Sequence, residues 1–462
     1  MDYKKSYRQV LLSALLTIVI YLFYSVEFIR ESVEDLSFDI VNQFVLSSQN
    51  EKLDAPNLLL FKIDDNYLKE KDLLDKHNET NYGYLFPRKY LADFITDLDS
   101  FLEEVEKENY PQALFIDYDM SYTSDPHNKK LSTDDKILLE VLKKNRKYTL
   151  YLPKTSSYNF IEKSFNKDIQ KAIKEKRIVF ISVGLTQSND NVSRRYYPYE
   201  EFYSRENKKT KYPLVDIELF KSITKKDKSL YKDFSQKNIS LIENRIIFKD
   251  YEFQENIDGS EFIQSKWENF KIFSANYELE SIIEEDFANA VIYLGGAHSN
   301  SDDVFVKDTF DKELSGIEMH GNALMTLFYL DGKLNRLNLF WALLIICPVI
   351  FFTELFIQFI AKVFKSKDSK IIQNKKVSLI IEDGYIMFTT VILFLMSYYL
   401  LIEHKVWFNW LIPSLMTTTI PFLSILYNFF RRENLKRLVS IIVMLFTFQW
   451  LRKRFKKVGK KE

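Results

Sequence analysis

The sequence predicts an α/β domain, built on a largely parallel sheet with helices, that is flanked by one N-terminal and three C-terminal transmembrane helices. Two observations lead to this prediction. Four apolar stretches lie near the ends of the chain, at residues 10–29, 339–364, 385–402 and 407–430. Between them, apolar runs typical of buried strands alternate with stretches of helical periodicity, as they do in parallel sheets covered by helices.

Within the domain, residues 30–338, strands are expected at short apolar runs, most of which end in an acid or a glycine. They are predicted at residues 58–65, 111–119, 148–152, 178–184 and 290–296, with helices at 90–108, 137–142 and 320–330. Residues 203–237 are rich in lysine and poorly periodic, which indicates a surface insertion. Ligands of parallel sheets bind beyond the carboxyl ends of the strands, and the residues expected at those ends are Asp64, Asp117, Gly184 and Gly295.

The flanking charges predict how the chain crosses the membrane. Each apolar stretch is near the ~20 residues that span a bilayer. Lysine and arginine gather before the first stretch, between the second and third, and after the fourth. The positive-inside rule then places residues 1–9, 365–384 and 431–462 in the cytoplasm and residues 30–338 on the extracytoplasmic, periplasmic side of the cytoplasmic (inner) membrane. The alternative for the first stretch is a cleaved signal peptide, but no A-x-A-like site follows it.

The tail, residues 431–462, holds a short apolar run at 438–451 between basic clusters. Crossing the membrane there would carry Lys456, Lys457, Lys460 and Lys461 outward, against the charge rule. We expect an interfacial helix on anionic membrane lipid, with a fifth crossing as the alternative.

Composition limits the function further. The chain has 64 basic and 64 acidic side chains, so nothing in its charge suggests nucleic-acid binding. Its one cysteine, Cys347, lies in the second apolar stretch, which leaves the external domain without a disulfide, a thiolate metal site or a cysteine nucleophile. A domain held by its core alone fits a bacterial exterior, and no cofactor is expected.

Four blocks of the domain resemble the CHASE2 family of extracytoplasmic sensory domains. Ile63-Asp64-Asp65-Asn66-Tyr67-Leu68, with Phe86-Pro87-Arg88 after it, is similar to I-D-x-x-S-L … W-P-x-x-R, and Ala113 to Asp117 is similar to A-x-x-I-x-x-D. Gly184 to Arg195 resembles G-x-x-N … D-x-D-G-x-x-R-R. The most specific block runs from Val291 through Asp303 to Gly316-Ile317-Glu318-Met319-His320-Gly321-Asn322, and resembles V-x-I-G … D-x-F … P-G-V-E-x-H-A-N.

The resemblance implies a sensor, and the departures from the family pattern bear on its output. Ser315 stands where the family has proline, and Gly321 where it has alanine. Family members usually continue into a cytoplasmic cyclase or kinase, whereas only residues 431–462 follow the last predicted span here. The output is therefore expected to belong to a separate cytoplasmic protein.

Arginines are the strongest candidates for binding an anion, because a guanidinium matches carboxylate and phosphate. They are Arg88, Arg194 and Arg195. The alternative, which we favour, is that they pair inside the fold with Asp64, Asp117 or Asp303, since buried charges need partners.

The glycine pair Gly295 and Gly296 could turn backbone amides toward an anion, but a tight turn with positive φ is the plainer interpretation. His298, Asp302, Asp303 and His320 match no recognised metal-ligand spacing, so no metal is predicted. His320, with Asn322 beside it, is expected to fix the start of the helix that leads into the membrane. No catalytic motif is found. The ligand-binding candidates are Asp64, Arg88, Asp117, Arg194, Arg195, Gly295, Gly296, Asp303, His320 and Asn322.

Glu354 lies inside the second predicted span, where an acid is expensive and is usually functional or partnered. The alternative is that it reaches the inner headgroups or is protonated in place.

Three functions remain open from the sequence. The first is a CHASE2-type sensor that binds a small-molecule ligand outside and signals through its helices. The second is an envelope scaffold that binds other proteins and senses nothing, and the third is an external enzyme, for which no motif speaks. The expected partners are membrane lipid, an unidentified small molecule, a separate cytoplasmic signalling protein and, in a homodimer, a second copy of the chain.

Overall fold

A computed structural model describes residues 27–82, 85–124, 131–156, 159–164, 166–187, 192–196, 198–203, 209–225, 244–255, 261–301, 304–306, 313–332, 334–367 and 375–414. The chain divides into two compact units. One is Asp35–Arg336, and the other combines Met1–Glu34 with Leu337–Glu462. Each unit is described by itself.

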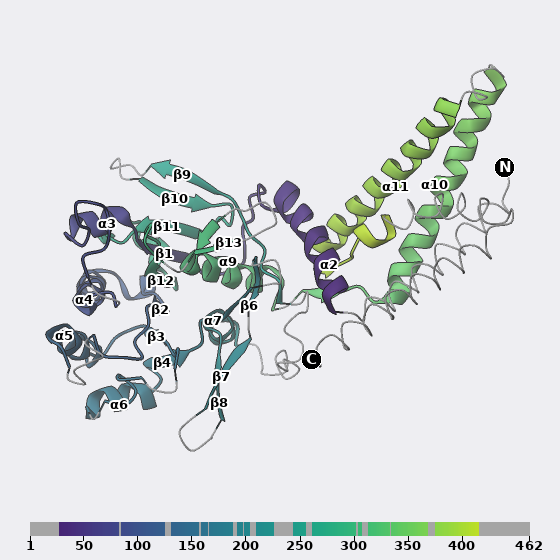
Figure 1. Cartoon of the computed structure of the whole chain (residues 1–462). Helices are drawn as coiled ribbons and strands as arrows, with labels where there is room; N and C mark the ends of the chain where they lie inside the picture. The colour runs from purple at the N-terminus through teal and green to yellow at the C-terminus, as the bar shows by residue number, and fades with distance from the viewer. Residues whose placement is uncertain are drawn as a thin grey trace, which may run out of the picture. The chain divides into compact units, whose positions relative to one another are not determined.

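The unit Asp35–Arg336 is built on a sheet of eight strands in the order β4-β3-β2-β12-β1-β11-β10-β9 (Figure 1). The first six pair in parallel and the last two are antiparallel. This confirms the predicted α/β domain with a largely parallel sheet. The strands are β1 Leu58–Ile63, β2 Ala113–Asp117, β3 Thr149–Pro153, β4 Ile178–Ile181, β9 Tyr251–Glu255, β10 Glu261–Ser265, β11 Phe270–Ser274 and β12 Val291–Gly296.

Shorter strands form hairpins outside the main sheet. They are β5 Leu185–Gln187 with β6 Ser193–Tyr196, β7 Tyr199–Tyr203 with β8 Lys209–Pro213, and β13 Val304–Val306 with β14 Glu313–Ser315; β15 Asn335–Arg336 ends the unit.

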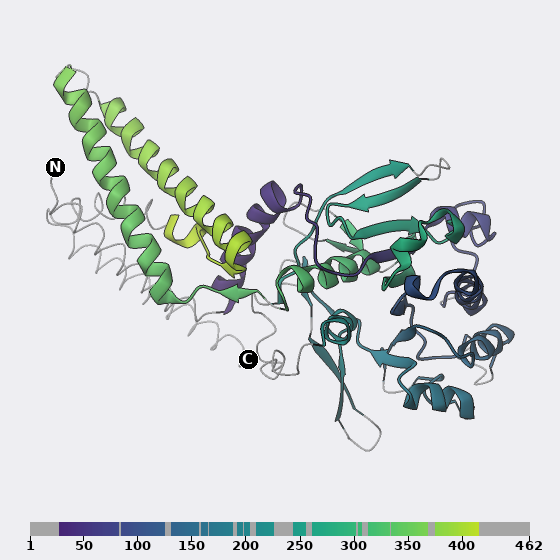
Figure 2. The ribbon, with the colours of Figure 1, turned by 180° about the vertical axis from the view of Figure 1, so that it is seen from behind.

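Helices cover both faces of the sheet, α4, α5 and α6 on one face and α7 and α9 on the other (Figures 1 and 2). The helices are α2 Glu27–Val41, α3 Asp65–Glu70, α4 Arg88–Glu104, α5 Thr133–Leu142, α6 Lys167–Lys174, α7 Val215–Thr224, α8 Glu284–Phe287 and α9 Gly316–Tyr329, with short helical turns η1 Asn42–Leu46, η2 Lys107–Asn109 and η6 Leu279–Ser281.

Strand β1 explains why the sheet is covered on both faces. All but one of its residues are buried, so its apolar run is continuous rather than alternating. Leu59, Phe61 and Ile63 join the core beneath α4, where the Phe61 and Phe94 rings lie 5.2 Å apart. Leu60, on the opposite face, is equally buried.

Helix α9 lies close against the sheet because glycines face it. A Cβ on Gly295 of β12 would lie 2.8 Å from Cβ of Ile317, and one on Gly321 of α9 would lie 2.5 Å from Cζ of Phe270. The helix begins where the Glu318 carboxylate accepts hydrogen bonds from the Ser315 backbone N–H and hydroxyl, at 3.0 and 2.6 Å. A proline at position 315 would lack the first of these donors.

Helix α2 differs from the prediction, which ended the N-terminal anchor at residue 29. The helix runs without a break from Glu27 to Val41, across that boundary. Neither glycine nor proline occurs in this segment to end it. The rest of the predicted anchor, residues 10–26, lies outside the described residues.

The second unit contains two helices long and apolar enough to cross a membrane, α10 Leu339–Lys367 and α11 Lys375–His404. The apolar spans within them are Phe340–Ile360 and Ile386–His404, and the rings of Phe356 and Phe388 stack between the helices at 5.7 Å. These helices overlap two of the predicted spans; four spans remain a prediction.

The remaining C-terminal span was predicted to start at residue 407, and the structure differs there. Trp407 belongs to the short strand β16 Val406–Trp407, and helix resumes only at residue 411. Lys405 ends α11 with a positive φ of 52°, and Asn409 caps the next turn by accepting from the Leu411 N–H at 3.2 Å. Residues 415–462, which include the rest of this span and the predicted interfacial helix, lie outside the described residues.

Candidate functional site

The residues predicted to bind a ligand separate into two places in the domain. Asp64, Asp117 and Gly295 lie at the carboxyl edge of the parallel strands, as predicted, with Gly296 beside Gly295, and Gly184 follows the end of β4 by three residues. Arg194, Arg195, His320 and Asn322 lie elsewhere, among buried contacts of α9, β6 and α2. Asp303 lies outside the described residues. Glu354 falls within α10, and its side chain is not among those described.

At the carboxyl edge, the acids have local structural partners. The Asp64 carboxylate caps α3, accepting from the Tyr67 N–H at 2.9 Å, and also accepts from the Ser274 hydroxyl at 2.9 Å. Asp117 is half-buried and pairs in register with Gly295 of the neighbouring strand. This edge therefore offers carboxylates between β1, β12 and β2, where the strand order changes direction.

The glycine pair is not a turn. Both Gly295 and Gly296 belong to the extended strand β12, and among the described glycines only Gly332 has a positive φ. Gly295 is needed for the close approach of α9, and a Cβ on Gly296 would lie 3.1 Å from the Tyr118 hydroxyl. The expected positive-φ turn is therefore wrong, and close packing is the physical reason for these residues.

Arg88 is buried and paired inside the fold. Its Nε lies 3.1 Å from Oδ1 of Asp135, its Nη2 donates to the Tyr122 carbonyl at 2.5 Å, and its guanidinium lies 4.8 Å from the centre of the Phe160 ring. Pairing within the fold was the favoured alternative, but the partner is Asp135 rather than Asp64, Asp117 or Asp303. Burial lowers the pKa of Arg88, and the carboxylates of Asp135 and Asp119 oppose that shift.

The two histidines considered for a metal lie in different environments. His298 Nε2 is 3.3 Å from the Tyr82 hydroxyl, and burial lowers the pKa of its imidazole. His320 pairs with Asp216 instead. Among the described residues, no three His, Cys, Asp or Glu side chains are grouped as metal ligands, and Asp302 and Asp303 lie outside those residues.

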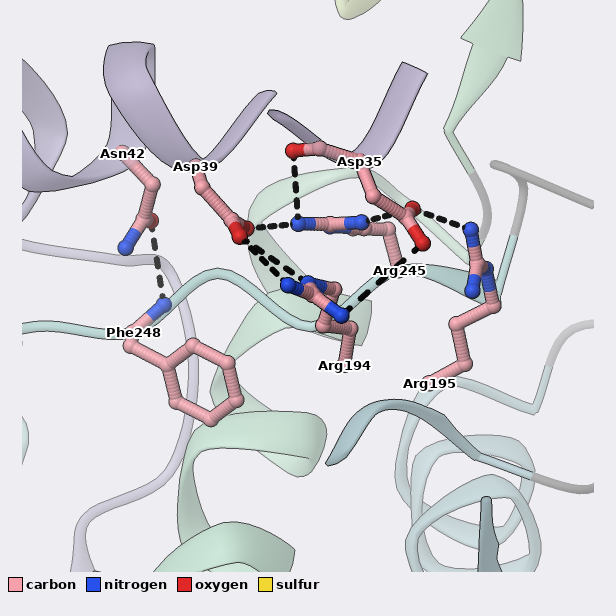
Figure 3. A network of polar contacts seen from close by, with 7 residues as sticks. All are labelled: Asp35, Asp39, Asn42, Arg194, Arg195, Arg245 and Phe248. Carbon is pink, nitrogen blue, oxygen red and sulfur yellow. Dashed lines mark hydrogen bonds and ion pairs between the residues drawn. The ribbon is translucent and has the colours of Figure 1, made fainter. Parts of the chain in front are cut away.

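The densest polar group in the domain is a buried arginine–aspartate cluster, formed by Asp35, Asp39, Arg194, Arg195 and Arg245 (Figure 3). Every member is at most 4% exposed. The two aspartates stand four residues apart on α2 and so share one face of that helix. They bind arginines from β6 and from the segment that starts at residue 244.

The contacts within the cluster are short and shared. Arg194 places both Nε and Nη2 at 2.9 Å from Oδ2 of Asp39. Arg245 bonds both aspartates, through Nη1 to Asp35 and Nη2 to Asp39, and Arg195 bonds Asp35 (Figure 3). Burial lowers the pKa of Arg245, while Asp39 and Asp35 act to raise it. The buried ion pairs of the cluster thus hold α2 against β6.

The segment that carries Arg245 is buried from residue 244 to 249 and belongs to none of the named strands; we call residues 244–250 the strap. It runs beside β6, and the Ile246 N–H donates to the Arg194 carbonyl at 2.9 Å. On the N-terminal side of the domain, the Phe248 N–H donates to Oδ1 of Asn42 at 3.2 Å (Figure 3), and the Asp250 N–H donates to the Ser47 carbonyl at 2.8 Å.

The strap is also bonded to α9. The Ile247 N–H donates to Oγ1 of Thr326 at 2.9 Å, and the Lys249 N–H donates to Oδ1 of Asn322 at 3.2 Å. Asn322 further accepts from the Trp267 indole N–H at 3.2 Å and donates to the Tyr251 hydroxyl at 2.8 Å. Asn322 is fully buried, so each of its amide atoms is used to hold the strap and its surroundings against α9.

His320 fixes α9 from another side. Its Nδ1 lies 2.8 Å from Oδ2 of Asp216 on α7, an arrangement in which the imidazole N–H donates to the carboxylate. Oδ1 of the same carboxylate accepts from the Tyr293 hydroxyl of β12 at 2.6 Å. Burial, and then the Asp216 charge, raise the pKa of Tyr293 well above its usual value. His320 was expected to fix a helix start, and it joins α9 to α7 and the sheet.

Sequence reasoning missed the strap and three of the five members of the cluster, Asp35, Asp39 and Arg245. The spacing of Asp35 and Asp39 and the position of Arg245 before Ile246-Ile247-Phe248 were the available signals. Two surface hollows, of about 250 and 260 Å³, lie at residues 143–177 and 198–221. Neither is lined by a predicted site residue.

No family profile, curated protein or solved structure matches this chain.

Proposed function

We propose that this chain is a membrane-anchored extracytoplasmic sensor or receptor of the CHASE2 type. A small molecule would bind the domain of residues 30–338 outside the cytoplasmic membrane. The apolar helices on either side of the domain would carry the change to a separate cytoplasmic protein.

The observation that carries the proposal is the double attachment of the strap. One side of it is bonded to Asp35, Asp39 and Asn42, which follow the predicted N-terminal anchor in the sequence. The other side is bonded to Asn322 and Thr326 of α9, which precedes α10. A ligand that favours one position of the strap would therefore bias both ends of the domain together.

The predicted site residues lie in two groups, and this supports giving them two different roles. Arg194, Arg195, His320 and Asn322 act as positioning residues, because their polar atoms are engaged with buried partners. The ligand would then bind at the carboxyl ends of the parallel strands, where Asp64, Asp117 and Gly296 are half-buried rather than enclosed.

The test is a thermal-shift screen of the full chain in detergent against small anions, nucleotides, sugars and metal ions. A ligand at 100 times its dissociation constant adds about 2.7 kcal/mol to the unfolding free energy, which raises the midpoint measurably. We expect at least one such compound, with a shift that is lost in Asp117→Asn and kept in the exposed control Glu140→Gln. If a cooperatively unfolding chain responds to nothing in the library, the scaffold function replaces the sensor.

A further inference from the structure

Strand β9 forms an open edge of the main sheet. It is the last strand in the sheet order, and no other described strand pairs with its outer side (Figures 1 and 2). Phe253, at the middle of the strand, is 79% exposed, more than any other large apolar side chain described in this domain. Edge strands are commonly protected by charged residues, above all lysine, by proline or by a bulge; β9 has no lysine, proline or bulge, and its charged residues are Glu252 and Glu255.

The backbone groups that face this open edge follow from the pairing with β10. The Lys266 N–H donates to the Asp250 carbonyl at 2.9 Å, just before Tyr251 pairs with Ser265. Bonded and non-bonded positions alternate along an antiparallel pair, so Glu252 and Gln254 bond to β10. The N–H and C=O groups of Tyr251, Phe253 and Glu255 therefore point away from β10, toward the open edge.

This pattern is complementary to itself. In an antiparallel pair with a two-fold axis at Phe253, each outward N–H meets an outward C=O of the other copy. Phe253 then lies opposite the partner's Phe253, and Tyr251 lies opposite the partner's Glu255. Glu252 faces Gln254 rather than another carboxylate, and it is already paired with Lys266 of its own chain. The register thus brings the exposed aromatic rings together and sets no two like charges directly opposite.

We propose that β9 is a dimerisation edge, at which two copies of this chain join their sheets through antiparallel β9 strands centred on Phe253. The inference concerns the assembly of the chain and is independent of whether the domain senses a ligand.

A disulfide cross-link tests the register directly. In a bonded antiparallel pair the two Phe253 Cα atoms would lie about 5.5 Å apart, within the range of about 4.4–6.8 Å that a disulfide spans. The two Glu255 Cα atoms would be offset by four residues, about 14 Å along the strands. Phe253→Cys and Glu255→Cys, each in the full chain with Cys347→Ser, are oxidised in membranes and compared on non-reducing gels.

We expect Phe253→Cys to form a covalent dimer and Glu255→Cys to remain mostly monomeric. Equal cross-linking at both positions, or at neither, would overturn the proposal. The second variant is Phe253→Pro, which removes the aromatic ring and an N–H that points away from β10, but no hydrogen bond within the hairpin. In detergent, light scattering should find a dimer for the unmodified chain and a monomer for Phe253→Pro. A dimer that persists in the variant, or a monomeric unmodified chain, rejects this interface.

Discussion

Asp39→Asn is expected to lower the free energy of unfolding of the domain by about 3–5 kcal/mol, because it removes one partner from a buried ion-pair group. Asp39 bonds both Arg194 and Arg245, and all three residues are at most 2% exposed. Asparagine keeps the shape of the side chain but cannot balance the guanidinium charges. The loss is comparable to a large part of the 5–15 kcal/mol that typically stabilises a domain.

The measurement is the midpoint of thermal unfolding of the full chain in detergent, followed by tryptophan fluorescence. The matched control is Glu140→Gln, which also neutralises an ion-paired carboxylate, with Lys143, but on the surface. Exposed pairs contribute about 0–1 kcal/mol, so this control should hardly move the midpoint. The double variant Asp39→Asn with Arg245→Gln should lose less than the sum of the single losses, because the two side chains act in one network. Additive losses, or an Asp39→Asn midpoint equal to the control, would contradict the account of the cluster.

Gly321→Ala is expected to destabilise the domain by about 1–3 kcal/mol, the usual cost of overpacking a core. The added Cβ would lie 2.5 Å from Cζ and 2.8 Å from Cε1 of Phe270, a rigid ring held in the sheet. Helix α9 would have to move away from β11, and its bonds to the strap would lengthen. The prediction is notable because alanine is the residue that the CHASE2 pattern has at this position.

A compensating substitution separates this clash from a helix effect. Alanine has a higher helix propensity than glycine, which alone would stabilise α9. Gly321→Ala should therefore lower the unfolding midpoint less in a chain that already carries Phe270→Leu than in the unmodified chain. A stabilised Gly321→Ala single variant would mean that α9 does not lie against Phe270.

The sheet could be predicted from the sequence because its signals are local. The runs that became β1, β2, β3, β4 and β12 are short and mainly apolar, and each strand overlaps the range predicted for it. The edge hairpin of β9 and β10 was not predicted, because its alternating charged residues carry no core pattern. Helix α2 was divided at residue 29 because apolar content, rather than helical continuity, set the expected boundary.

The site was predictable only in part. Arg194, Arg195, His320 and Asn322 were identified as important through their resemblance to a family pattern, but their partners come from distant parts of the chain. Arg194 meets Asp39 across 155 positions and His320 meets Asp216 across 104, separations that no local periodicity reveals. The strap was not predicted because its residues, 244–250, mix apolar and charged side chains and follow neither a helical nor an alternating pattern.

Two departures from the CHASE2 pattern have local explanations. Ser315 supplies an N–H and a hydroxyl to the Glu318 carboxylate, which a proline could not do. Gly321 leaves room for Phe270. Both changes keep α9 in place by other means, so they are compatible with the proposed assignment to that type of domain.

If the strap couples α2 to α9, hydrogen exchange of the full chain carrying Asp39→Asn should change in both helices as well as in the strap. Amides of β3 and β4 serve as the reference for global unfolding. These strands lie at one end of the sheet, and β9, which follows the strap in the sequence, lies at the other. We expect the amide exchange rate to rise above this reference in α2, in residues 246–249 and in α9 around Asn322 and Thr326. An increase confined to α2, with the strap and α9 unchanged, would contradict it.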